Sequence, residues 1–264
     1  MGAESIFSYA TLFGFLFALA RVSGVFAFVP LAAFKAAPAA ARIVLSLAIT
    51  LMMRADWRTP IGADAAVNGV MLDRVVAGLA AEAGLGLAIG VSMSIVFEVF
   101  EMAAQAVSLQ AGLGYASTID PSSGADSTVL LTTAQLTAGL LFFVSGADRL
   151  MVRALVVSLR LLPPESFTLH QSWATAIVQF AAAIFSSGLR LAAPLIALLL
   201  LADASLAILG RVQPQLHLIS LTMPLKLAAT MLVLSVTIVL QPGFFESLMT
   251  TWTRLIEGML RSPR

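Results

Sequence analysis

Two carboxylates and three smaller polar groups recur at helical spacing along one apolar stretch of this sequence. They are Ser94, Glu98, Glu101, Gln105 and Ser108. At about 100° per residue these side chains fall within one narrow sector of a helix. Such a polar stripe either lines an aqueous path or contacts a neighbouring subunit, because its charges must be shielded from lipid in both cases. Both interpretations stay open at this point.

Other residue types that commonly perform chemistry do not form a site. His170 and His217 have no histidine or carboxylate three or four positions away, so no metal site is predicted. No Gly-x-x-x-x-Gly-Lys-Ser/Thr run exists, which excludes a P-loop ATPase. Ser122, Ser123 and Gly124 are typical of an Asp-Pro-Ser-Ser-Gly turn. They do not indicate the catalytic site of an intramembrane serine protease, because no helix-borne histidine offers a base. The chain has no cysteine, and we expect no enzyme activity and no cofactor.

The composition is that of an integral membrane protein or of a buried part of a membrane assembly. Of the 264 residues 59% are hydrophobic and 11% are charged, against roughly 25% charged in an ordinary soluble domain. Such a chain lacks the polar surface needed to stay in water. The net charge of +1 gives no case for binding nucleic acid. Glu4 is the only charge before Arg21, so we expect a retained first helix rather than a cleaved signal peptide.

The hydrophobic pattern predicts an all-α, polytopic membrane-type fold with long helices and helical hairpins. A bilayer core of about 30 Å needs about 20 apolar residues in a helix. Pro214 and Pro224 are expected to fix the turn between the last two long helices. We expect helices over 6–31, 39–53, 72–108, 129–159, 173–212 and 216–240, closed by Gln-Pro-Gly, and an amphipathic tail over 244–260.

Two of these helices are longer than a bilayer requires. Residues 72–108 and 173–212 would extend over about 55 and 60 Å, at 1.5 Å per residue. Either they break, with Ser186-Ser187-Gly188 and Pro194 as candidate sites, or they project beyond the bilayer into a larger body. Their charges favour the second alternative, since each would cost about 2.5–3.5 kcal/mol facing lipid at a helix centre. These charges are Glu82, Glu98, Glu101, Arg190 and Asp203.

A G-x-x-x-G pair, Gly86 and Gly90, lies upstream of the polar stripe. Small residues allow helix backbones to approach closely. The preferred interpretation is packing within the chain, and a specific dimer is the alternative.

A segment of small, flexible and acidic residues interrupts the apolar sequence at its middle. It reads LQAGLGYASTIDPSSGADSTVL, residues 109–130, and contains no lysine or arginine. Glycine lowers the barrier to backbone rearrangement. Asp-Pro-Ser-Ser-Gly adds turn chemistry without a hydrophobic core. The segment is therefore expected to rearrange easily.

The same segment resembles the middle of FliR, a family of flagellar type III export-gate proteins. As in that family, LQAGLGYASTIDPSSG is followed by an apolar helix. The stretch GRVQPQLHLISLTMPLKLAATMLVL, residues 210–234, resembles a later FliR segment. Length, helix order and the amphipathic tail agree, so the resemblance covers nearly the whole chain. In the later segment the matching positions are Gly210, Arg211, Pro214, Gln215 and Pro224.

The resemblance implies a non-enzymatic subunit of the flagellar export channel, at the centre of the basal body in the bacterial inner membrane. FliR-like chains join FliP-like and FliQ-like subunits, with an FlhB-like subunit attached, and unfolded export substrates pass through. Residues 1–165 would form a FliP-like helical part that includes a plug loop at about 109–128. Residues 166–264 would form a FliQ-like helical hairpin plus the amphipathic helix. Together they would make one structural unit in contact with membrane lipid.

The family's plug sits in the closed pore, and the match assigns it here to residues 110–124. Ala111 and Gly114 are smaller than the residues common at these positions in the family. This departure bears on how the plug packs and not on which segment forms it. An ordinary exposed connector is the alternative. The plug residues implied by the match are Gln110, Gly112, Gly114, Asp120, Pro121 and Gly124, and the polar stripe leads to them. The hairpin turn is assigned to Arg211, Pro214, Gln215 and Pro224.

Two other classes compete with this interpretation. Injectisome export-gate proteins, the SctT family, share the general pattern, but the form L-Q-x-G-L-x-x-A-x-x-x-D-P is more typical of flagellar members. A proton-coupled secondary transporter would use the membrane carboxylates, and it predicts matched discontinuous helices in two halves. The Ser-Ser-Gly-Leu-Arg segment has no counterpart in the first half of the sequence. We therefore expect an export-gate subunit.

Overall fold

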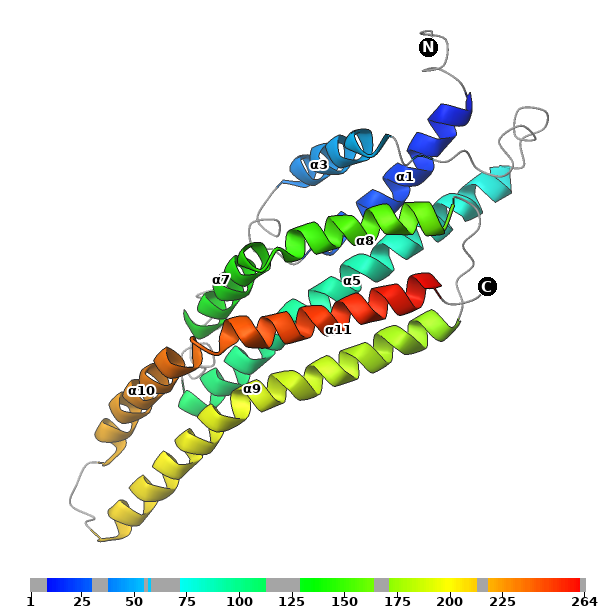
Figure 1. The fold of residues 1–264 in the computed structure, drawn as a ribbon. Coiled ribbons are helices and arrows are strands. Elements are labelled where there is room, and N and C mark those ends of the chain that lie inside the picture. Colours follow the sequence, from blue (N-terminus) through cyan, green and yellow to red (C-terminus); the bar gives the residue numbers. More distant parts are fainter. Residues whose placement is uncertain are drawn as a thin grey trace. The chain divides into compact units, whose positions relative to one another are not determined.

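The fold is entirely helical wherever the structure describes it. A computed structural model describes residues 9–29, 38–54, 57, 72–112, 129–163, 171–212 and 218–261. The predicted all-α class is confirmed for these residues (Figure 1). The helices are α1 (Tyr9–Ala27), α3 (Ala39–Met52), α5 (Leu72–Ala111), α7 (Val129–Val144), α8 (Ala147–Leu161), α9 (Gln171–Val212), α10 (Leu218–Thr237) and α11 (Gln241–Arg261).

The two longest helices are continuous. α5 has 40 residues and α9 has 42. Pro194 lies inside α9, so a break at Pro194 or at residues 186–188 is wrong. At Gly188 the reason for a glycine is packing instead: a Cβ there would come 2.6 Å from Met102 Cε and 3.3 Å from Val99 Cγ1. The small residue lets α9 approach α5 without ending the helix.

The helix predicted over 129–159 is two helices, α7 and α8. They meet at Ser145 and Gly146, and Gly146 has φ of 73°. This left-handed conformation suits glycine and interrupts a helix. The amide of Ser145 donates to Leu141 O at 2.9 Å and so completes the last turn of α7. A single glycine inside an apolar run was too weak a signal to predict this break.

The Gln-Pro-Gly run does not close the preceding helix but opens the next one. α10 ends at Thr237, and α11 begins at Gln241 with Pro242 in its first turn. Proline fits there because the first N–H groups of a helix have no intrahelical partner, and its φ is already helical. The amphipathic tail is therefore longer at its start than predicted.

The apolar lengths support membrane crossing. Two helical stretches, Val75–Ala111 and Ser172–Val212, are long and apolar enough to span a bilayer. The bent pairs α7 with α8 and α10 with α11 also qualify if each counts as one span, giving up to four spans in the described residues. Length and composition alone set these numbers.

The chain divides into two compact units, each built from separate segments. One unit comprises Met1–Ile95, Gly146–Ala181 and Met249–Arg264, and the other comprises Val96–Ser145 and Ala182–Leu248. α5, α9 and α11 each contribute residues to both units. The units mix residues from both halves of the sequence. The FliP-like and FliQ-like division predicted from the resemblance is a statement about relatedness and stays a prediction.

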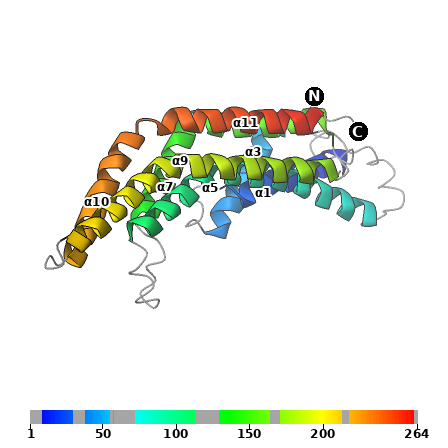
Figure 2. The ribbon, with the colours of Figure 1, turned by 90° about the horizontal axis from the view of Figure 1, so that it is seen from below.

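The first unit is held together by a glycine contact and a buried core. α1 lies against α5 (Figure 1 and Figure 2), and a Cβ at Gly86 would collide with Arg21 O. A Cβ at Gly90 would come 2.5 Å from Val25 O. The G-x-x-x-G pair therefore serves packing within the chain. Trp252 of α11 is fully buried and donates from Nε1 to Ser92 Oγ at 3.0 Å.

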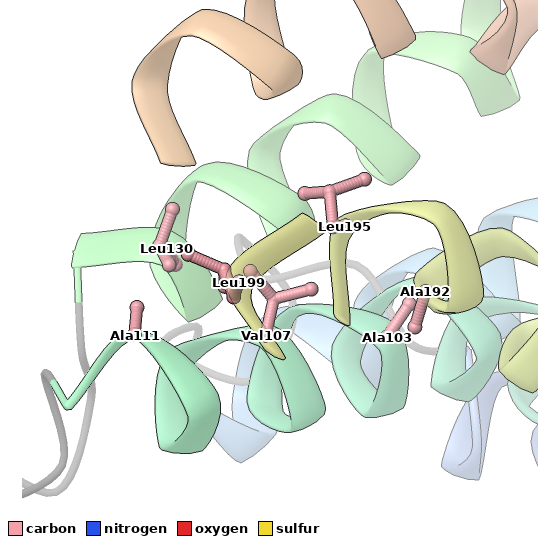
Figure 3. Packing of buried hydrophobic residues seen from close by; sticks show 7 residues of the cluster. All are labelled: Ala103, Val107, Ala111, Leu130, Ala192, Leu195 and Leu199. Atoms are coloured by element: carbon pink, nitrogen blue, oxygen red, sulfur yellow. The ribbon is translucent and has the colours of Figure 1, made fainter. Parts of the chain in front are cut away.

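The second unit has a core of small and branched side chains between α5, α7 and α9 (Figure 3). Phe97 extends this unit's core through rings of Phe142, 5.5 Å away, and Phe245, 6.4 Å away between ring centroids. These separations are those of favourable tilted and edge-to-face contacts. The core cluster consists of Ala103, Val107, Ala111, Leu130, Ala192, Leu195 and Leu199.

Candidate functional site

The predicted polar stripe lies entirely on α5, and its members differ in exposure. Glu98 and Gln105 are exposed, and Glu101 is half-buried. Ser94 is half-buried, and its Oγ donates to Val91 O at 2.8 Å. Ser108 is buried, and its Oγ has no hydrogen-bond partner among the described residues. The stripe is thus open in the middle of α5 and closed near its C-terminal end.

The C-terminal end of α5 lies further along the chain than the sequence predicted. α5 continues to Ala111, so Gln110 belongs to its last turn and not to the loop. Gly112 follows with φ of 79°, and its N–H donates to Leu109 O at 3.1 Å. A left-handed glycine immediately after a helix is a common C-terminal cap. The other predicted plug residues, Gly114, Asp120, Pro121 and Gly124, lie outside the described residues.

A charged cluster surrounds this end of α5 in the second unit. Lys226 Nζ of α10 lies 2.6 Å from Asp203 Oδ1 of α9. Gln110 Nε2 donates to the other oxygen, Asp203 Oδ2, at 3.2 Å. Lys226 Nζ also donates to Gln110 O at 3.4 Å. Three helices therefore meet through one lysine, one aspartate and one glutamine, and α5 is distant in the sequence from the consecutive helices α9 and α10.

The sequence had shown only half of this cluster. Asp203 was expected to face protein or water rather than lipid, and its carboxylate does pair with protein. Its partner was missed, although the only lysines of the chain are Lys35 and Lys226. A lone acid and a lone lysine on consecutive apolar helices are a usable signal for an interhelical ion pair, because neither charge is stable in lipid.

A second charged network lies in the core of the first unit. Arg21 and Glu82 are 0% and 1% exposed, and Arg21 Nη2 is 2.5 Å from Glu82 Oε2. Arg21 also donates to Ser158 Oγ at 3.3 Å and to Leu162 O at 2.9 Å. The last bond satisfies a carbonyl at the C-terminal end of α8. Glu82 was expected to be shielded from lipid, but pairing with Arg21 was not predicted.

The predicted hairpin-turn residues do not all lie in the connector. Arg211 is exposed in the last turn of α9. Pro214 and Gln215 lie outside the described residues. Pro224 is inside α10 and exposed, so it does not form the turn. A proline removes one backbone hydrogen bond, and at this position α10 continues through it.

The cavities of the two units offer little chemistry. A cavity of about 60 Å³ in the second unit is lined mostly by apolar side chains, with Thr133 and Gln241 among its polar ones. A cavity of about 210 Å³ in the first unit includes Arg153, Glu257 and Arg261. Within the described ranges no group of three or more metal-ligating side chains gathers.

Fold and site together define a class: a helical membrane-type protein with interhelical ion pairs in both of its units. Residues 12–252 match the family described as "Bacterial export proteins, family 1". The chain belongs to this family, and the resemblance to FliR is confirmed. Membership implies a non-enzymatic protein that works within an export-gate complex.

Individual relatives agree with the family assignment. The chain is 30% identical over 176 residues to "Flagellar biosynthetic protein FliR" of Pectobacterium carotovorum subsp. carotovorum, covering 67% of each chain. It is 26% identical to the FliR protein of Bacillus subtilis (strain 168), covering 84% of this chain and 85% of that one. It is also 26% identical to "Surface presentation of antigens protein SpaR" of Shigella sonnei, over 54% of this chain and 55% of that one.

Proposed function

We propose that the chain is a subunit of the flagellar type III protein export gate. The observation that carries this proposal is the similarity to FliR proteins, which is higher in identity or coverage than the similarity to SpaR. Replacing the resident fliR gene of a motile bacterium tests it. We expect this chain, expressed with its own partner subunits, to restore secretion of flagellin; restoration of injectisome effector secretion alone would favour the SpaR-like alternative.

The proposed partners are FliP-like, FliQ-like and FlhB-like subunits, in the bacterial inner membrane at the centre of the basal body. The surface of α9 supports such partners, because only 17% of an 18-residue apolar stretch within Ser172–Val212 is buried within the chain. Exposed apolar faces of this extent mark contacts with protein or lipid. We expect the chain to be monodisperse only when co-expressed with these subunits. A long-lived monomer in mild detergent would contradict this.

The proposed role of residues 109–128 is to plug the idle pore, through which unfolded substrates pass during export. Support comes from the described residues before this segment. The polar stripe of α5 leads toward it, and Gly112 ends the helix in a left-handed conformation. The stripe, from Ser94 to Ser108, would then line the pore or an interface with a neighbouring subunit. A plug must fill the lumen and yet be displaceable, and turn residues without a hydrophobic core suit both needs.

Shortening the loop separates a plug from a connector. Deletion of residues 114–124 should leave the complex assembled, because the flanking helices carry the packing. The idle gate should then conduct ions or admit a normally excluded solute when the complex is overproduced. Deletion of the equally long segment 58–68 is the matched control. Wild-type leakage in an assembled complex would leave residues 109–128 as a linker.

A further inference from the structure

The charged cluster at the C-terminal end of α5 joins this helix to both α9 and α10. Lys226 in α10 contacts the carboxylate of Asp203 in α9 at 2.6 Å. The same ammonium donates to the backbone carbonyl of Gln110, at 3.4 Å. One side chain thus satisfies a charge on α9 and a carbonyl at the end of α5.

The position of this lysine matches what a helix end requires. The last four carbonyls of a helix have no intrahelical partner, and a cation near them is favoured by the helix dipole. The N–H of Gly112 donates to Leu109 O, and Lys226 Nζ donates to Gln110 O. The Gln110 side chain then returns to Asp203 at 3.2 Å. The end of α5 is therefore fixed from outside, by groups on α9 and α10.

The partial exposure of this cluster distinguishes it from a core ion pair. Lys226 is 14% exposed and Asp203 is 35% exposed. Charges that reach water separate at lower cost than fully buried ones, and their pairing is correspondingly weaker. Apolar contacts between Ala111, Leu199 and their neighbours already hold the helices together. The apolar contacts supply most of the stability of this helix packing. The charged contacts mainly set how the helices are aligned, because an ion pair forms in only one register of the helices.

We propose that Asp203 and Lys226 form a clamp that sets the position of the C-terminal end of α5. They are positioning residues: the α9–α10 hairpin acts through them on α5. The consequence for the gate rests on the proposed function, which assigns pore closure to the segment that α5 carries. Shifting α9 or α10 would release the end of α5 and so loosen that segment.

Spin-label distances measure the clamp directly. The chain has no cysteine, so Leu109→Cys on α5 and Leu201→Cys on α9 introduce its only thiols for labelling; both positions are more than 60% exposed within the chain. In the full chain, purified with its co-expressed subunits, we expect one narrow distance distribution. Asp203→Asn or Lys226→Met should abolish the narrow peak. Asp203→Glu and Lys226→Arg should keep it, and Glu246→Gln, an exposed acid of the same unit, is the matched control.

Two further measurements complete the test. The double variant Asp203→Asn with Lys226→Met should broaden the distribution no more than either single variant, because the two residues act as a unit. A narrow peak in both neutral variants would overturn the clamp, whatever the gate does. Leakage of the idle gate is recorded in the same variants. A broadened distribution without leakage would keep the clamp and reject its effect on the gate, whereas the plug itself is tested by the loop deletion, so the failures of the two proposals are distinguishable.

Discussion

Two interhelical ion pairs, one in each unit, show how differently a membrane-type chain can use charge. Arg21 and Glu82 are almost completely buried, and the arginine has two further acceptors, Ser158 Oγ and Leu162 O. Lys226 and Asp203 are partly exposed and contact the C-terminal end of α5. Because the first pair is buried, water cannot solvate either charge if its partner is removed, and both residues are needed together. Exposure makes the second pair separable.

The largest effect is expected from breaking the buried pair. Glu82→Leu leaves Arg21 charged and buried without its carboxylate, which costs about 3–5 kcal/mol. We expect the thermal unfolding midpoint of the purified, assembled protein to fall strongly, or the chain to fail to accumulate. The double variant Arg21→Met with Glu82→Leu should recover most of the loss, because an apolar pair is about as stable as a buried ion pair. An unchanged midpoint in Glu82→Leu would contradict the contrast between the two pairs.

The next effect concerns the glycine that lets α1 reach α5 beside the buried pair. Gly86→Ala places a methyl group against Arg21 O, which belongs to the backbone and cannot rotate away. Overpacking of this kind costs about 1–3 kcal/mol. Gly258→Ala in α11 is the control, since a Cβ there meets nothing within 4 Å. Equal unfolding midpoints for the two variants would mean that α1 and α5 do not pack as described.

A smaller effect is expected from the partly exposed pair. Asp203→Asn keeps the size of the side chain and removes its charge, and exposed pairs contribute about 0–1 kcal/mol. The unfolding midpoint should therefore shift much less than in Glu82→Leu, although the end of α5 loosens. Measuring both variants in the same assembled complex sharpens the comparison. A loss as large as that of Glu82→Leu would make the second pair a core element.

The smallest effect on stability is expected at the exposed part of the polar stripe. Glu98→Gln with Glu101→Gln should leave the unfolding midpoint close to wild type, because Glu98 is exposed and Glu101 half-buried. Export and co-purification then decide between the two interpretations of the stripe. Reduced export with intact assembly supports an aqueous path, and reduced co-purification supports a subunit contact. Wild-type values of both would reject both.

Much of the fold could be predicted because apolar length and polar spacing are local properties. The starts of α3 and α5 agree with the predicted helices to the residue, and the stripe from Ser94 to Ser108 lies on one helix as expected. The break at Gly146 was not predicted, and Pro224, which was assigned to the hairpin turn, lies inside α10. Both depend on whether one residue's backbone preference prevails over a long apolar run, and tertiary packing decides that.

The charge pairs were missed for a different reason, although a lone acid and a lone lysine on consecutive helices were a usable signal for the pair of Asp203 and Lys226. Hydropathy shows that Glu82 and Asp203 need partners, but it does not say which cation supplies them. Arg21 is 61 positions from Glu82, and Gln110 is 93 positions from Asp203. Such distances are bridged only by the packing of helices, which a single sequence does not encode locally. The predicted plug residues from Gly114 to Gly124 lie outside the described residues and stay predictions.

The outward surface of α9 has a consequence for how cells make this protein. Leu201 and Ile208 are more than 60% exposed there, and Arg190 is exposed midway along the same helix. This surface is too oily for water, while the arginine makes it costly in lipid. In a newly synthesised chain this surface is therefore unfavourable both in water and in lipid until another protein covers it. We expect the supply of those proteins to set the cellular level of this chain, with the orphaned surplus removed by proteolysis, so that the gate regulates its own stoichiometry.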